Sequence, residues 1–157
     1  MALSKTKLTV LAIAVFLLPM LSCGRSYNTL KDGYYTAVAA VFDDYGWKEY
    51  VTICVSGGRI ILAEYDAYNS SGFIKSWDMD YMRVMEAQDG TYPNAYTRYY
   101  SSNLIERQST SGIDALSGAS HSFPSFISLA DTVLKNAAEG NNKTTIVMFG
   151  ELLGEMH

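Results

Sequence analysis

A run of small and hydroxyl-bearing residues in the second half of the chain is the segment best suited to chemistry. It spans residues 114–122 and reads Asp-Ala-Leu-Ser-Gly-Ala-Ser-His-Ser. An amphipathic pattern follows at once, so the segment approaches a helix N-terminus, where free backbone N–H groups and the helix dipole favour an anion such as phosphate. A capping loop without any ligand explains the same residues, because Ser is a common N-cap and Gly a common turn residue. Spacing alone favours the capping loop.

The amphipathic pattern predicts the helix that would position this segment. Its apolar residues fall on one helical face, and they are Phe123, Phe126, Ile127, Ala130, Val133, Leu134 and Ala137. We expect Ser122 to cap this helix, Pro124 to lie in its first turn and residues 140–142 to end it. Two further helices are expected, one over 78–87 and one that Asn94 can cap.

The first half of the domain has the alternation and turn residues of β-strands. Strands are expected over 31–41, 47–55 and 60–65. The paired glycines Gly57 and Gly58 supply the positive φ angles of a tight hairpin between the last two strands. Consecutive strands on short turns predict an antiparallel β-meander with helices packed on it, an α+β fold. The apolar run 146–149 is expected to add an edge strand.

The N-terminus predicts export and a lipid anchor. Two lysines precede an apolar run over 8–18, which has the length of a signal-peptide core and is short for a membrane span. Ser22 and Cys23 follow it, and this small residue before a cysteine resembles a bacterial lipobox. The expected organisation is a signal peptide over 1–22, a tether over 23–31, one domain over 32–140 and a tail over 141–157. An ordinary signal peptide with an incidental cysteine is the alternative.

Composition excludes several classes of function. The chain has 157 residues and a formal net charge of −4, so it lacks the basic face on which nucleic-acid binding depends. Two His and two Cys cannot readily build a conventional zinc site, and we expect no metal. Once Cys23 carries lipid, Cys54 has no partner and is expected to be a small buried hydrophobe. Neither Asp43–Asp44 nor Asp78–Asp80 predicts acid–base chemistry, because Asp at turns and helix starts usually caps the backbone.

The motif Asp114-x-x-Ser117-Gly118-Ala119-Ser120 before a helix resembles the flavin-attachment motif of the FMN-binding domain family. The likeness runs from about residue 31 to 139, and it includes an opening strand that starts Asp-Gly-Tyr-Tyr-Thr at residue 32. Other matching segments are Gly46-Trp47-Lys48, Gly58-Arg59-Ile60, Tyr65-Asp66 and Lys75-Ser76. They are most similar to the small lipoproteins of the family, which include spirochaetal membrane immunogens and pheromone-type lipoproteins.

The resemblance implies that an exported flavin transferase attaches FMN to the Ser120 hydroxyl as a phosphoester. Asp114, Ser117, Gly118 and Ala119 match the recognition part of the motif, and His121 follows the attachment position. His121 would either bond the phosphate or flavin, or be a solvated loop residue. Ser120 departs from the family, in which Thr is usual, so the efficiency of attachment is open.

The function that the resemblance implies is electron transfer by a lipid-anchored flavoprotein rather than catalysis by a stand-alone enzyme. Its partners would be a bacterial membrane, the flavin transferase and redox donor and acceptor proteins, with the domain on the periplasmic or cell-surface side. Trp47, Trp77 and Tyr92 are candidates for stacking on the flavin. The alternative is a surface lipoprotein that acts as a binding or structural module, with non-covalent flavin or none.

Overall fold

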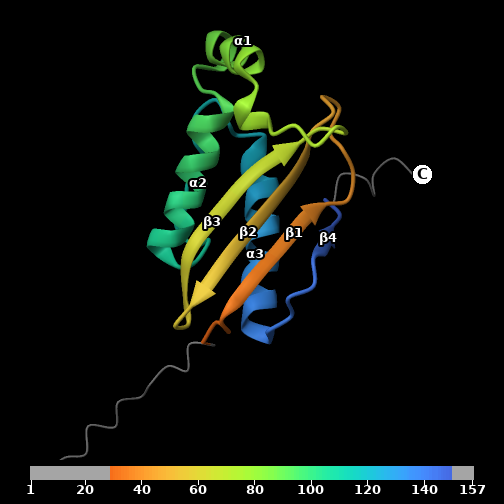
Figure 1. Ribbon diagram of the computed structural model, residues 1–157. Helices are drawn as coiled ribbons and strands as arrows, with labels where there is room; N and C mark the ends of the chain where they lie inside the picture. The colour runs from red at the N-terminus through yellow and green to blue at the C-terminus, as the bar shows by residue number, and fades with distance from the viewer. Residues whose placement is uncertain (1–28, 150–157) are drawn as a thin grey trace, which may run out of the picture.

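The fold is a four-stranded sheet with two long helices on one face (Figure 1), and the α+β prediction is confirmed. The computed structural model describes residues 29–149; Cys23 and the predicted signal peptide lie outside the described residues. Helices α2 and α3 cover the sheet, and the short helix α1 lies beyond one end of it. The elements are β1 (Gly33–Ala39), β2 (Lys48–Ser56), β3 (Arg59–Tyr68), the 3-10 helix η1 (Lys75–Trp77), α1 (Met79–Asp89), α2 (Pro93–Arg107), α3 (Ser122–Glu139) and β4 (Thr145–Val147).

The sheet has the order β3-β2-β1-β4, and its first three strands form the predicted antiparallel meander. The β2–β3 hairpin turns through Gly57 at φ 60° and Gly58 at φ 73°, as the paired glycines predict. The expected edge strand is β4, which pairs parallel to β1. Its direction follows from the crossover, because α3 runs back along the sheet before the chain turns into β4 (Figure 1).

The core lies between the sheet and the two long helices, and aromatic rings fill its centre. Tyr100 and Phe126 are stacked at 4.8 Å between ring centroids and 15° between planes. Tyr65 of β3 packs against both of them, at 6.0 and 5.1 Å. Cys54 is buried and free, as expected.

Two predicted helix caps are wrong. α3 begins at Ser122 itself, because the N–H of Ser122 already bonds the carbonyl of Ala119 and the chain turns before that point. α2 begins at Pro93, one residue before Asn94, since the ring of proline fixes a helical φ in the first turn. Asn94 instead accepts a bond from the Arg98 guanidinium.

The segment 114–121 is tied firmly to α2 and to the end of α1. The Tyr100 hydroxyl accepts a bond from the N–H of Leu116 at 3.1 Å and donates to the carbonyl of Ala119 at 3.4 Å. Ala119 is buried, and Gly118 has φ 78°. A Cβ atom on Gly118 would collide with the backbone oxygen of Asp89, so glycine is required here by close approach.

We predict that Gly118→Ala destabilises the domain more than Gly72→Ala. Gly72 also has positive φ, at 83°, but no atom lies within 4 Å of its added Cβ, so this variant measures the backbone strain alone. The collision with Asp89 adds about 1–3 kcal/mol, the usual cost of overpacking. Urea unfolding of both variants measures the difference, and equal losses of stability would show that the close approach is not rigid.

Candidate functional site

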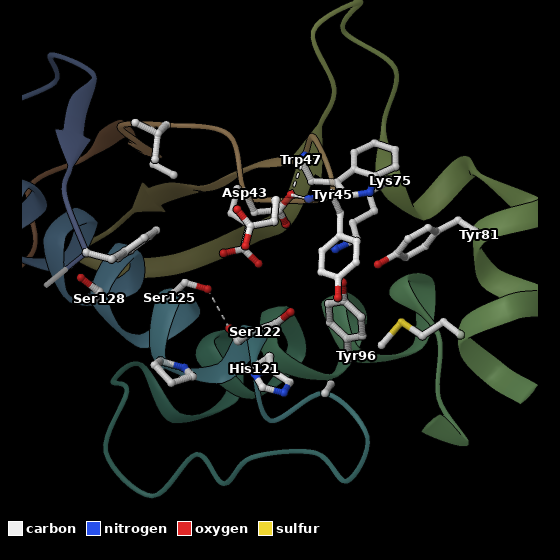
Figure 2. A pocket seen from close by; sticks show the side chains of 18 of the residues that line it. Asp43, Tyr45, Trp47, Lys75, Tyr81, Tyr96, His121, Ser122, Ser125 and Ser128 are labelled. Atoms are coloured by element: carbon white, nitrogen blue, oxygen red, sulfur yellow. Dashed lines mark hydrogen bonds between the residues drawn. The ribbon is translucent and has the colours of Figure 1, made fainter. Parts of the chain in front are cut away.

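A cavity of about 610 Å³ opens at the end of the sheet where α3 begins (Figure 2). Its wall comes from five parts of the chain: the β1–β2 loop with the strand ends beside it, the segment from η1 into α1, Tyr96 of α2, the residues before and in the first turns of α3, and residues 148–149 after β4. Its size is that of a small-molecule site.

The cavity brings together only part of the predicted motif. Gly118, Ala119 and His121 line it, whereas Asp114 and Ser117 are exposed outside it. Ser120 is exposed between two lining residues. Within the described residues its hydroxyl has no hydrogen-bond partner, and no side chain caps the first turn of α3. The capping interpretation of this serine is therefore not supported.

Aromatic side chains form much of the cavity wall. Of the three stacking candidates only Trp47 lines it, with 6% of its surface exposed. Trp77 is 66% exposed elsewhere on the surface, and Tyr92 precedes α2 outside the cavity. Sequence reasoning missed the tyrosines of the wall, and these are Tyr45, Tyr81 and Tyr96.

Asp43 fixes the loop that carries Trp47 and Tyr45. Its Oδ1 accepts the N–H of Tyr45 at 2.9 Å and that of Trp47 at 2.8 Å. The N–H of Asp43 in turn donates to the carbonyl of Trp47 at 2.7 Å. This carboxylate caps a turn, as predicted.

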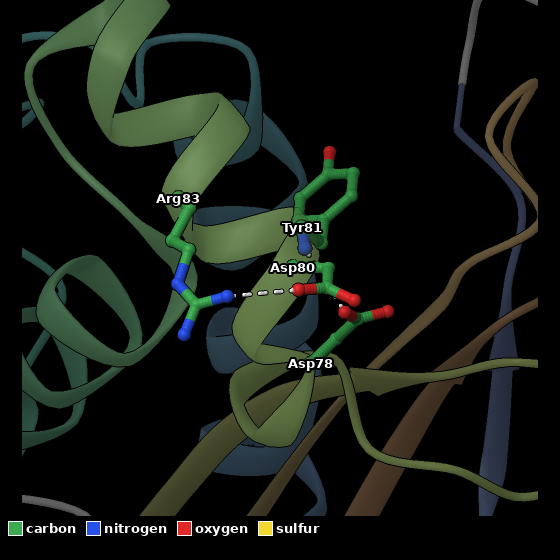
Figure 3. A network of polar contacts seen from close by, with 4 residues as sticks. All are labelled: Asp78, Asp80, Tyr81 and Arg83. Carbon is green, nitrogen blue, oxygen red and sulfur yellow. Dashed lines mark hydrogen bonds and ion pairs between the residues drawn. The ribbon is translucent and has the colours of Figure 1, made fainter.

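Asp78 fixes Tyr81 on the other side of the cavity. It is the N-cap of α1, and its Oδ1 accepts the N–H of Tyr81 at 2.9 Å (Figure 3). Asp80 forms an exposed ion pair with Arg83 at 3.1 Å. Both aspartates thus serve the local structure, as expected from their place at a helix start.

Lys75 is buried in the cavity wall against aromatic faces. Its Nζ lies 5.1 Å from the ring centroid of Tyr81 and 5.8 Å from that of Trp47. Only 6% of Lys75 is exposed, and within residues 29–149 its ammonium has neither a hydrogen bond nor an ion pair. Burial lowers the pKa of Lys75, although nearby carboxylates, Glu49 first among them, oppose this effect.

Glu49 brings a carboxyl group into the same cavity from β2. Its Oε1 accepts a 2.7 Å bond from the Tyr65 hydroxyl, and the carbonyl oxygen of Ser122 lies 3.1 Å from the same hydroxyl, so the two oxygens share its one proton. Burial raises the pKa of Glu49, while hydrogen bonds from Ser125 and Tyr65 and the charge of Lys75 oppose the rise. Burial of the Tyr65 hydroxyl likewise raises the pKa of Tyr65.

The wall carries more negative than positive groups. Asp43, Asp44, Glu49 and Asp89 line it, together with Lys75 and His121. A dianionic phosphate is therefore disfavoured inside the cavity, whereas an uncharged ring is compatible with its aromatic wall.

One sequence signal could have indicated Glu49. Glu49 has the same strand parity as Val51, Ile53 and Val55, so the alternation directs a carboxyl group toward the core. A charged residue at a core-facing position is a stronger functional signal than an aromatic residue there.

The chain is similar to a spirochaetal lipoprotein. It is 32% identical to the "15 kDa lipoprotein" of Treponema pallidum over 121 residues, which are 77% of this chain and 86% of that protein. The chain belongs to the family of this lipoprotein. The similarity agrees with the spirochaetal lipoproteins expected from the sequence.

A solved structure shares the fold and much of the sequence. The CPE2226 protein from Clostridium perfringens is 41% identical, with a TM-score of 0.73, over 76% of this chain and 98% of that one. No protein-family model matches the chain. Between residues 29 and 149, no helix is both long and apolar enough to cross a membrane.

We predict that Glu49→Gln becomes more stable relative to the wild type as pH rises. The carboxyl faces Lys75, Asp43 and Tyr65, and burial raises its pKa above the ordinary value of 4.5. The folded wild type therefore holds a proton that the unfolded chain has released, and its stability falls as pH rises from about 4.5 through the raised pKa. The amide does not titrate and escapes this loss.

Urea unfolding at successive pH values measures the difference between the variant and the wild type. Glu86→Gln, on an exposed part of α1, is the reference for replacing a carboxyl by an amide. A difference that stays flat or falls above pH 4.5 would contradict a raised pKa.

Proposed function

We propose that the protein is a lipid-anchored flavin carrier that holds FMN as a phosphoester on Ser120, with the flavin ring in the adjacent cavity. One observation carries this proposal: an exposed serine hydroxyl without a partner lies between residues that line an aromatic cavity. The resemblance of residues 114–120 to a flavin-attachment motif is a second, independent support.

The charges around the site fit a cofactor whose phosphate lies outside the cavity and whose ring lies inside it. The phosphate would remain outside, at the start of α3, where the helix dipole favours negative charge. The uncharged ring would occupy the cavity, whose wall includes Trp47, Tyr81 and Tyr96. The ribityl chain between them is flexible and crosses the rim formed by Gly118, Ala119 and His121.

The described fold also fits a lipid anchor at Cys23. The N–H of Lys31 bonds the carbonyl of Ala137, near the C-terminal end of α3, whereas the cavity lies at the N-terminal end of that helix. Eighteen helical residues separate the two ends by about 27 Å. An anchor attached before Lys31 would thus leave the cavity at the far end of the domain, accessible to partner proteins (Figure 1).

Bound FMN would supply reversible one- and two-electron redox chemistry, and the chain would supply attachment, orientation and local charge. The partners of such a carrier are an exported flavin transferase and unidentified redox proteins. No substrate-transforming role follows from these residues, so we propose electron transfer on the outer side of a bacterial membrane.

A second candidate function is a surface lipoprotein that binds a small ligand without covalent flavin. The similarity to the "15 kDa lipoprotein" of Treponema pallidum supports the lipoprotein part of this candidate. Serine in place of the usual threonine at the attachment position favours it also. Both candidates require the cavity as a binding site, and they differ at Ser120.

We predict that co-expression with a flavin transferase adds FMN less one water to the intact mass of the protein. The addition reflects a phosphoester at the Ser120 hydroxyl, so Ser120→Ala should abolish it. Ser122→Ala is the matched control, since this nearby serine also lines the cavity but lies in α3.

Ser120→Thr separates the two candidate functions. Modification of both the wild type and the threonine variant supports the flavin carrier. An unmodified wild type beside a modified threonine variant would overturn covalent attachment and leave the ligand-binding lipoprotein.

A further inference from the structure

Lys75 and Glu49 are two polar groups that the fold directs into one cavity without pairing them. Lys75 is more than nine-tenths buried, with its ammonium over the rings of Trp47 and Tyr81, and Glu49 accepts a hydrogen bond from the Tyr65 hydroxyl. Within residues 29–149 the one ion pair is Arg83–Asp80, so none joins Lys75 to Glu49. Burying charged groups without direct pairing is costly, and a ligand that bonds both would offset the cost.

The backbone holds both groups in place. Glu49 lies in β2, opposite Ala67 of β3. Lys75 begins η1, and the next residue, Ser76, donates its N–H to the buried carboxylate of Asp66 at 3.3 Å. Two fixed polar groups beside aromatic faces are typical of a site that recognises the edge of a flat ring.

We propose that Lys75 and Glu49 recognise the polar edge of a planar heterocycle, with the Lys75 amine donating to a ring carbonyl and a Glu49 oxygen accepting from the adjacent ring N–H. The ring lies beside Trp47 and Tyr81, whose planes cross at 70°, so it stacks on one of the two side chains and meets the edge of the other. This inference rests on the proposed function and deepens it, since the pyrimidine part of a flavin presents such an edge: N3–H between two carbonyl groups.

The chemistry of the cavity selects this ligand edge over an anionic one. A carboxylate or phosphate would meet the four acidic groups of the wall, Asp43, Asp44, Glu49 and Asp89. An uncharged imide bonds a donor and an acceptor at once, which is the combination that Lys75 and Glu49 present. The two residues would thus determine specificity rather than act as catalytic residues.

Riboflavin tests the inference apart from covalent attachment, because it has no phosphate and cannot form the phosphoester. We would titrate the full-length Ser120→Ala protein, purified in detergent, with riboflavin and with 3-methylriboflavin, and follow flavin fluorescence anisotropy. Methylation removes the N3 donor and should weaken binding about tenfold, as expected for one lost hydrogen bond to a charged group.

Variants identify which residue causes the difference in affinity between riboflavin and 3-methylriboflavin. Glu49→Ala should bind the two flavins with similar affinity, whereas Asp44→Asn, at an exposed carboxylate in the same wall, should keep the tenfold preference. Lys75→Met should weaken both flavins in parallel, because it loses the bond to a carbonyl that both possess. The comparison of the two flavins on the Ser120→Ala protein leaves every residue that lines the cavity unchanged.

Equal affinity for the two flavins, no binding of riboflavin, or a preference that survives Glu49→Ala would each overturn the inference. These outcomes are independent of the mass measurement. Flavinylation of Ser120 without discrimination at N3 would leave the carrier function and reject this role for Glu49 and Lys75. Discrimination at N3 without flavinylation would keep the role of Glu49 and Lys75 in recognition and reject covalent attachment at Ser120.

Discussion

The contacts of Tyr65 join the hydrophobic core to the cavity, and the site depends on them. The ring packs among Tyr96, Tyr100 and Phe126, and the N–H donates a 3.0 Å hydrogen bond to the hydroxyl oxygen of Ser101 in α2. The hydroxyl then reaches the carboxyl of Glu49 and the first residue of α3. Each aromatic pair contributes about 0.5–1.5 kcal/mol beyond the burial of its area. The position of the carboxyl is therefore supported by the packing of the whole domain.

The cavity retains groups that folding alone does not favour. Lys75 is buried with aromatic contacts and no carboxylate partner, and Glu49 has a raised pKa because of its burial. Apolar residues of similar volume would be equally well or better accommodated at such positions. Both groups line an aromatic cavity, which is consistent with ligand recognition, and the exposed Ser120 lies in the chain between Ala119 and His121, which line the same cavity.

The sequence predicts the scaffold better than the site, for physical reasons. Strand alternation, the Gly57–Gly58 turn and the amphipathic face of α3 are local patterns, so the meander and the last helix follow from them. The helix caps predicted at Ser122 and Asn94 are wrong because neighbouring groups, the Ala119 carbonyl and the Pro93 ring, decide where each helix begins. The segment 114–121 was recognised by its composition, but its structural role depends on the contact of Gly118 with Asp89.

The cavity itself could not be predicted, because its wall comes from segments far apart in the chain. Glu49, Lys75, Tyr81 and Tyr96 meet only through the packing of η1, α1 and α2 against the end of the sheet. Strand parity alone directs Glu49 inward, yet nothing local indicates that Lys75 lies in the same cavity. The predicted aromatic candidates illustrate this limit, since Trp47 lines the cavity and Trp77 does not.

The most direct test of the central claim is the visible absorption spectrum of the protein isolated from its native membrane, recorded before and after denaturation. We expect a flavin spectrum that stays with the precipitated chain and, after digestion, with the peptide that contains Ser120. A colourless protein would contradict the claim that this domain carries flavin. A chromophore released into the supernatant would contradict covalent attachment.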